Sequence, residues 1–173
     1  MVRYKIPLLL QCLTLLIPLN VYMWGNWLLV NLQWAFVRYQ YTGLGSGFIP
    51  INRDIDFILL GHTTGIHNIL AVLFWTTGGI LLLVAFFLTL IASLGEKAVP
   101  IRNASFLVFG AGLLFCLSAL ERFTAGFAIP LGIPLIFITG WITYRQQPEA
   151  DDAEEDADDE SDGSRPEGTP DPE

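Results

Sequence analysis

One stretch constrains the fold more than any other: residues 57–95 contain no Asp, Glu, Lys or Arg. Within it, the run His67–Leu94 is the most apolar segment of the 173-residue chain. About twenty apolar residues in a helix cross the hydrocarbon core of a bilayer, because each residue adds about 1.5 Å. We therefore predict a membrane-spanning helix over residues 66–94.

The composition is typical of a membrane protein with a charged tail. Hydrophobic residues make up 53% of the chain, although its last part is very polar. Residues 149–173 hold thirteen of the seventeen acidic residues, whereas residues 1–148 hold four acidic and eight basic residues. The tail lacks the apolar side chains that a core requires, so we predict that residues 146–173 are disordered. Such an acidic segment is typical of a salt-loving host, and it equally suits docking to a basic partner.

Three further apolar segments predict three further membrane spans, over residues 6–24, 104–120 and 126–144. Pro18 should kink or end the first, and Pro130 and Pro134 should unwind the start of the last. The expected fold class is thus an all-α membrane protein, with four transmembrane helices over residues 1–145, an outer interfacial segment and the disordered tail.

The connection over residues 25–65 supports two interpretations. Trp27, Trp34 and Tyr41 are spaced by seven, which suits a helix lying at the membrane surface, and this is the interpretation we favour. A strand fits residues 25–42 equally well, because polar residues also alternate there, at Asn31, Gln33, Arg38 and Gln40.

The distribution of basic residues predicts the orientation. With the N-terminus inside, five bases lie near cytoplasmic helix ends and three near outer ones. We therefore expect a multi-pass protein of the cell membrane with both termini cytoplasmic and the 25–65 connection outside.

Small residues recur along two of the predicted spans, where another backbone could approach closely. The two rows are Ala71, Gly78, Ala85 and Ala92 in the second span, and Ser105, Gly112, Cys116 and Ala119 in the third. We expect the two rows to pack against each other within the protein. A membrane protein partner or a second copy of the chain is the other possible neighbour.

Few residues suggest chemistry. Two carboxylates and two imidazoles lie within fourteen residues, and could in principle hold a divalent metal: Asp54, Asp56, His62 and His67. We expect them to be ordinary loop residues, because their spacing matches no known metal motif. Glu121 and Arg122 lie at a membrane boundary, and we expect them to belong to a hydrated turn rather than to guard a pore. If they are not hydrated, each should need a different partner, because adjacent residues of a helix do not face each other.

Three short motifs stand out: Pro18 followed by Val21-Tyr22, then Leu29-Val30-Asn31, and Arg122 followed by the segment 128–132. They resemble those of a family of small, uncharacterised membrane proteins from halophilic archaea. The resemblance implies a multi-pass protein of a haloarchaeal membrane. It implies no activity, cofactor or site residue.

The sequence favours a structural, accessory or partner-binding membrane protein. We expect no enzymatic role, no cofactor and no nucleic-acid partner, and the lipid bilayer is the expected environment. A small transporter or channel component is the first alternative, and a membrane enzyme with an outer Asp/His metal site is the second.

Overall fold

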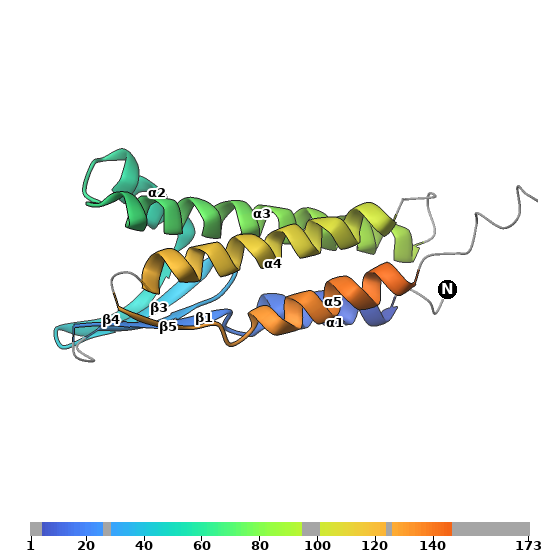
Figure 1. The fold of residues 1–173 in the computed structure, drawn as a ribbon, viewed down its shortest axis with the longest axis horizontal. Helices are drawn as coiled ribbons and strands as arrows, with labels where there is room; N and C mark the ends of the chain where they lie inside the picture. Colours follow the sequence, from blue (N-terminus) through green and yellow to red (C-terminus); the bar gives the residue numbers. More distant parts are fainter. Residues whose placement is uncertain (1–4, 26–28, 95–100, 124–125, 147–173) are drawn as a thin grey trace, which may run out of the picture.

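The computed structural model describes residues 5–25, 29–94, 101–123 and 126–146. Figure 1 shows two long helices running the length of the molecule, with a sheet along one half of them and two short helices along the other. The elements in chain order are α1 (Lys5–Leu16), β1 (Asn20–Trp24), β2 (Leu29–Gln33), β3 (Val37–Thr42), β4 (Gly45–Pro50), α2 (Ile51–Leu59), α3 (Ile66–Leu94), α4 (Ile101–Phe123), β5 (Phe127–Ile129) and α5 (Ile133–Arg145).

The prediction of an all-α fold with four transmembrane helices is wrong. The fold is α+β, and its strands form one antiparallel five-stranded sheet in the order β4-β3-β2-β1-β5. Only α3 and α4, among the described residues, are long and apolar enough to cross a membrane. The helices α1 and α5 have 12 and 13 residues, so each is about 18–20 Å long, short of the ~30 Å hydrocarbon core.

The predicted span over 6–24 is divided between a helix and a strand. Helix α1 ends at Leu16, just before Pro18, whose ring and missing N–H interrupt helical hydrogen bonding. The chain then enters β1, where Val21 pairs with Leu32 of β2 on one side and with Ile129 of β5 on the other. The predicted span over 126–144 is divided in the same way, with β5 before Pro130 and α5 beginning at Ile133.

The 25–65 connection contains three strands and one short helix in its described part, so our preference for a surface helix over residues 25–42 is wrong. Strands β2 and β3 pair with each other, and Asn31 lies opposite Gln40. The polar alternation was therefore the correct signal. The spacing of the aromatic residues by seven was coincidental, because the chain reverses direction after β2 and Tyr41 lies on the antiparallel strand β3. Helix α2 follows β4 directly.

The interior of the protein holds an apolar core, which includes Trp75, Leu82 and Phe115, together with many polar side chains, and the exterior is unusually apolar. Fully buried side chains include Gln11, Thr14, Asn20, Asn31, Gln33, Thr89, Ser105, Ser118, Thr139 and Thr143. Large apolar side chains are exposed along the helices, among them Leu9, Leu16, Ile80, Phe87, Leu113, Leu120, Ile138 and Trp141. Such extensive exposure of large apolar side chains differs from that in water-soluble domains, which bury most large aliphatic residues.

The sheet shows an inverted pattern, with polar side chains on its inner face. On β1 and β2 the buried positions alternate, and they carry Asn20, Tyr22, Asn31 and Gln33. This inner face meets the helices, since Arg122 of α4 stacks on the Tyr22 ring. The opposite face of these strands is apolar and only half-buried, with Val21, Met23, Val30 and Leu32.

Two tryptophans attach the sheet to the helices. The indole N–H of Trp75 on α3 donates to the carbonyl oxygen of Trp34, in the turn between β2 and β3, at 2.8 Å. The indole N–H of Trp34 in turn donates to the carbonyl oxygen of Leu16, at the end of α1, at 2.9 Å. Because Trp75 is fully buried, this chain of contacts fixes the turn between the two halves of the molecule.

A glycine permits the close approach of the segment before β5 to β1. A side chain at Gly126 would overlap the carbonyl oxygen of Met23 and the ring of Trp24. Met23 and Phe127 pair directly after this contact. Any larger residue at position 126 must therefore push β5 away from β1.

We predict that Gly126→Ala destabilises the protein by about 1–3 kcal/mol, the usual cost of overpacking. Thermal unfolding of the purified protein in a neutral detergent measures the effect. The matched control is Gly47→Ala on β4, where a Cβ meets nothing within 4 Å and the change should be small. Equal unfolding temperatures for the two variants would contradict the close contact at Gly126.

Candidate functional site

An open polar pocket of about 260 Å³ lies between the inner face of the sheet, α2 and the adjoining ends of α3 and α4. Strands β1–β3 contribute Tyr22, Trp24, Leu29, Asn31, Arg38 and Gln40, and the α2–α3 segment and helices contribute Asp54, Phe57, His62, Thr63, Thr64, Asn68, Val72 and Arg122. It gathers polar groups from segments that lie far apart in the sequence. We take it as the candidate site.

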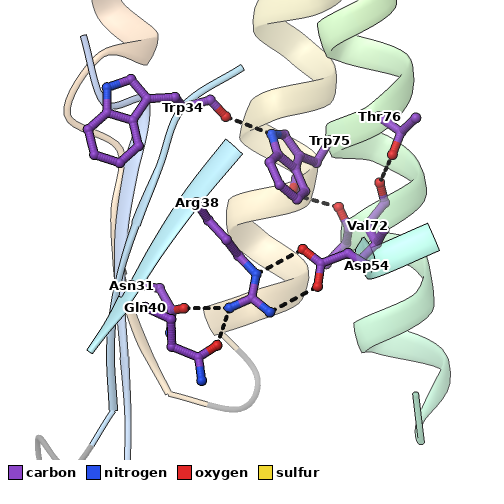
Figure 2. A network of polar contacts seen from close by, with 10 residues as sticks. Asn31, Trp34, Arg38, Gln40, Asp54, Val72, Trp75 and Thr76 are labelled. Atoms are coloured by element: carbon purple, nitrogen blue, oxygen red, sulfur yellow. Dashed lines mark hydrogen bonds and ion pairs between the residues drawn. The ribbon is translucent and has the colours of Figure 1, made fainter. Parts of the chain in front are cut away.

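Arg38 is the centre of the polar network (Figure 2). Its Nε donates to Oδ2 of Asp54 at 2.8 Å, and its second terminal nitrogen donates to Oδ1 at 2.9 Å. The remaining terminal nitrogen donates to Oδ1 of Asn31 at 2.7 Å and to the side-chain oxygen of Gln40. The bidentate pair therefore attaches α2 to strands β2 and β3.

The surroundings of Arg38 keep it charged. Burial by itself would lower the pKa of the guanidinium, but hydrogen bonds to Asp54 and Tyr22 and the negative charge of Asp54 oppose it, and the pKa is raised. Arginine is in any case protonated at ordinary pH. With its charge paired and four hydrogen bonds made, Arg38 is a positioning residue.

Arg122 occupies a different environment in the same pocket. Its side chain is only 7% exposed, and its guanidinium carbon lies 4.3 Å from the centre of the Tyr22 ring, within the range of a cation–π interaction. Its Nε has no hydrogen-bond partner among the described residues. Arg122 lies in the last turn of α4, where a positive charge also interacts favourably with the helix dipole.

Glu121 and Arg122 do have different partners, as expected for adjacent residues on a helix. Oε2 of Glu121 lies 2.6 Å from Nδ1 of His67 across the α3–α4 interface and accepts a hydrogen bond from it, while Arg122 stacks on Tyr22. The sequence favoured a hydrated turn here, which does not fit Arg122, because it is buried within α4. The alternative, a need for separate partners, agrees with the structure. The sequence did not identify either partner.

The four candidate metal ligands do not come together. Asp54 is bound to Arg38, and His67 is bound to Glu121. His62 contacts the ring of Phe57 edge-on, and Asp56 is exposed on α2. No group of three or more His, Cys, Asp or Glu side chains within the described residues is placed to hold a metal ion.

The two rows of small residues lie mostly in the interior. Ala71, Gly78, Ala85 and Ala92 are all buried on α3. A Cβ at Gly78 would lie 3.3 Å from the carbonyl oxygen of Ala111 on α4, and the hydroxyl of Ser118 on α4 donates to the carbonyl oxygen of Ala71 at 2.8 Å. The α3 row therefore faces α4.

The row on α4 does not simply face α3. Ser105, Gly112 and Ala119 are buried and Cys116 is half-buried. Gly112 faces α5, because a Cβ there would lie 3.1 Å from the Phe137 ring. Helix α4 thus packs between α3 and α5, and the α3 row meets a neighbouring stripe of α4 that contains Ala111 and Phe115.

Sequence reasoning missed most of the site. Tyr22 appeared only within the family-like motifs, Asn31 appeared there and in the polar alternation, and Trp24 was not considered as a site residue. The signal that could have found them was the alternation of polar residues in a segment that is otherwise apolar, because such residues share one face of a strand. Those family-like motifs do meet in the structure: Tyr22 pairs with Asn31 on one side and Ala128 on the other.

The sequence matches no protein-family model, and comparisons with curated proteins and with solved structures give no significant match. Inference about function therefore rests on the residues described above.

We predict that breaking the Arg38–Asp54 pair destabilises the protein strongly. Arg38→Met or Asp54→Leu should each cost about 3 kcal/mol, because the remaining charge stays buried without its partner. The double variant should cost clearly less than the sum, which chemical unfolding in detergent measures. Arg53→Gln, on the exposed side of α2, is the control and should change stability by less than about 0.5 kcal/mol. Additive effects would mean that the two charges are not coupled.

Proposed function

We propose that this protein is an integral membrane protein of the accessory or ligand-binding kind. The α3–α4 hairpin crosses the bilayer and holds the sheet and its polar pocket at one membrane surface. The observation that carries the proposal is the exposure of large apolar side chains along the outside of the helices, while many polar side chains are buried beside the apolar core.

Two features of the hairpin support this placement. Helices α3 and α4 have 29 and 23 residues, which correspond to lengths of about 43 and 35 Å. In the most apolar window of each helix, fewer than half of the residues are buried in the protein. A core helix of a water-soluble protein would cover most of such a surface with protein, so these exposed faces fit lipid better than water.

The sheet belongs outside the hydrocarbon core. Its edge strands β4 and β5 each pair with a neighbour on one side only, and open edges are not stable in lipid because their backbone groups lack hydrogen-bond partners. Counting about twenty residues back from Leu94 places the membrane boundary near Trp75. The pocket residues Asn68 and Arg122 then lie just beyond it, at the level of the lipid headgroups.

The proposed orientation has the sheet outside and both described ends of the chain inside. Lys5 of α1, Arg102 of α4 and Arg145 of α5 lie at the helix termini remote from the sheet (Figure 1). The sequence adds Arg3 and Lys97 next to those termini. Arg38, Arg53 and Arg122 lie at the other end. This bias favours a cytoplasmic location for the helical end.

The transporter and metal-enzyme alternatives have less support. The four candidate ligands of the enzyme are dispersed, as described above. The buried threonines in the helical half bond mainly to their own backbone: Thr89 to Ala85, Thr139 to Leu135 and Thr143 to Thr139. They therefore offer few free groups to a transported solute.

We predict opposite labelling of the two ends by a membrane-impermeant maleimide in intact cells. The background variant replaces Cys12 and Cys116 by alanine. Ser46→Cys on β4 should be labelled without lysis, whereas Lys5→Cys and Arg145→Cys should be labelled only after lysis. All three of these positions are exposed, so accessibility in the folded protein is matched.

Extraction provides the second measurement, and the protein should stay in the membrane fraction at alkaline pH. Release into the soluble fraction, or equal labelling of all three cysteines in intact cells, would contradict the proposal.

A further inference from the structure

We propose that the pocket binds an oxyanion, a phosphate or carboxylate group, and that Arg122 is its principal ligand. The site is that of the proposed function, and the proposal names the ligand chemistry that this site selects. Only the source of the anion depends on the proposed membrane placement. Its physical basis is the set of hydrogen-bonding groups that the pocket leaves unused.

The unused groups are all donors. Among the described residues that line the pocket, three buried side-chain atoms have no hydrogen-bond partner: Nε1 of Trp24, Nδ2 of Asn31 and Nε of Arg122. Each carries an N–H and none can accept a hydrogen bond in its ordinary protonation state. A buried donor without a partner costs about 1–3 kcal/mol, so a ligand rich in acceptor oxygens recovers free energy at each of them.

The charge of the pocket has the matching sign. Two arginines, Arg38 and Arg122, line it together with a single carboxylate, that of Asp54. Both oxygens of Asp54 are held by Arg38, so the charge of these two residues cancels. Arg122 remains, 7% exposed and without a carboxylate in contact among the described residues. A buried charge without a counter-charge is unfavourable, and an anion supplies the missing partner.

The carboxylate next to Arg122 in the sequence does not occupy this position. Glu121 points to His67 and lies within hydrogen-bond distance of its Nδ1, and it is not among the residues that line the pocket. Tyr22 holds the Arg122 guanidinium from one face. The planar edge of the guanidinium is the part that binds oxyanions, because it presents parallel N–H groups.

Asn31 is held in place by Arg38. Its Oδ1 accepts from Arg38 at 2.7 Å, which fixes the orientation of the amide and leaves the Nδ2 donor available. Arg38 and Asp54 therefore act as positioning residues, and Arg122, Asn31 and Trp24 supply the contacts to the anion.

Two sources of the anion are compatible with this chemistry. One is a free anion in solution, which reaches the pocket through its open side. The other is the phosphate of a lipid headgroup, because the pocket lies at the membrane boundary in the proposed placement. Both present the same oxygen atoms to Arg122.

Binding can be tested with the full chain purified in maltoside detergent at constant ionic strength. The probes are inorganic phosphate, acetate and phosphatidylglycerol added in mixed micelles. We expect at least one probe to raise the unfolding temperature of the wild type saturably. Arg122→Gln should lower the affinity for that probe by about tenfold or more, because the charge-assisted hydrogen bonds are lost. The control Arg53→Gln removes the same charge from the same end of the molecule and should bind like the wild type.

The probe that raises the unfolding temperature identifies the source of the anion. A response to phosphate or acetate in lipid-free detergent supports a free anion, and a response to phosphatidylglycerol alone supports a lipid headgroup. No response to any probe would overturn the proposal, as would an equal response in Arg122→Gln. Because binding is measured in detergent, its outcome is independent of the extraction and labelling results.

Trp24→Phe is a second variant, and it tests the proposal even if Arg122→Gln does not fold. It keeps most of the aromatic ring and removes only a donor that has no partner in the protein. We expect it to fold as stably as the wild type without the probe and to bind the probe about threefold to tenfold more weakly. Unchanged binding in a folded Trp24→Phe protein would exclude this indole from the site and overturn the proposed set of donors.

Discussion

The pairing of Arg38 with Asp54 is the interaction on which the rest of the sheet-bearing half depends. A polar sheet face turned towards apolar helices is unfavourable unless its groups find partners in the interior. Arg38 satisfies Asn31 and Gln40 on neighbouring strands, and Asp54 neutralises it from α2. One charged pair thus satisfies the part of the inner sheet face that carries Asn31 and Gln40 and leaves a pocket beside it, whereas the buried side chains of Asn20 and Gln33 have no hydrogen-bond partner among the described residues.

The inverted sheet also explains how the two halves of the molecule fit together. The helical half exposes many large apolar side chains and buries small and polar ones, as at Gly78 and Thr89, beside an apolar core that includes Leu82 and Phe115. The sheet continues this arrangement, with apolar residues outside and amides inside. Helices α3 and α4 run along both halves, so one pair of helices serves as support for the sheet and as the most apolar part of the protein.

The sequence predicted the long helices well and the sheet poorly, for identifiable reasons. Residues 66–94 form one helix with the predicted bounds, because an uncharged apolar run leaves no competing pattern. Strand β5 has three residues and pairs only with distant β1, so no local signal marks it. The polar alternation at Asn31 and Gln33 was visible, but the inner face of a strand is usually apolar, whereas here the polar residues point inward. Arg122 was recognised as a residue that needs a partner if it is not hydrated, yet its contact with Tyr22 depends on tertiary structure alone.

The central position of β1 has a consequence for the order in which the protein assembles. Its partner on one side, β2, follows it closely, whereas its partner on the other side, β5, comes only after the whole α3–α4 hairpin. Contacts between such distant segments are slow to form, because a long loop must close first. During synthesis, β1–β4 can form a meander early, and the edge of β1 stays open until α4 has been completed. Since Arg122 lies at the end of α4, the pocket is among the last features of the molecule to be completed.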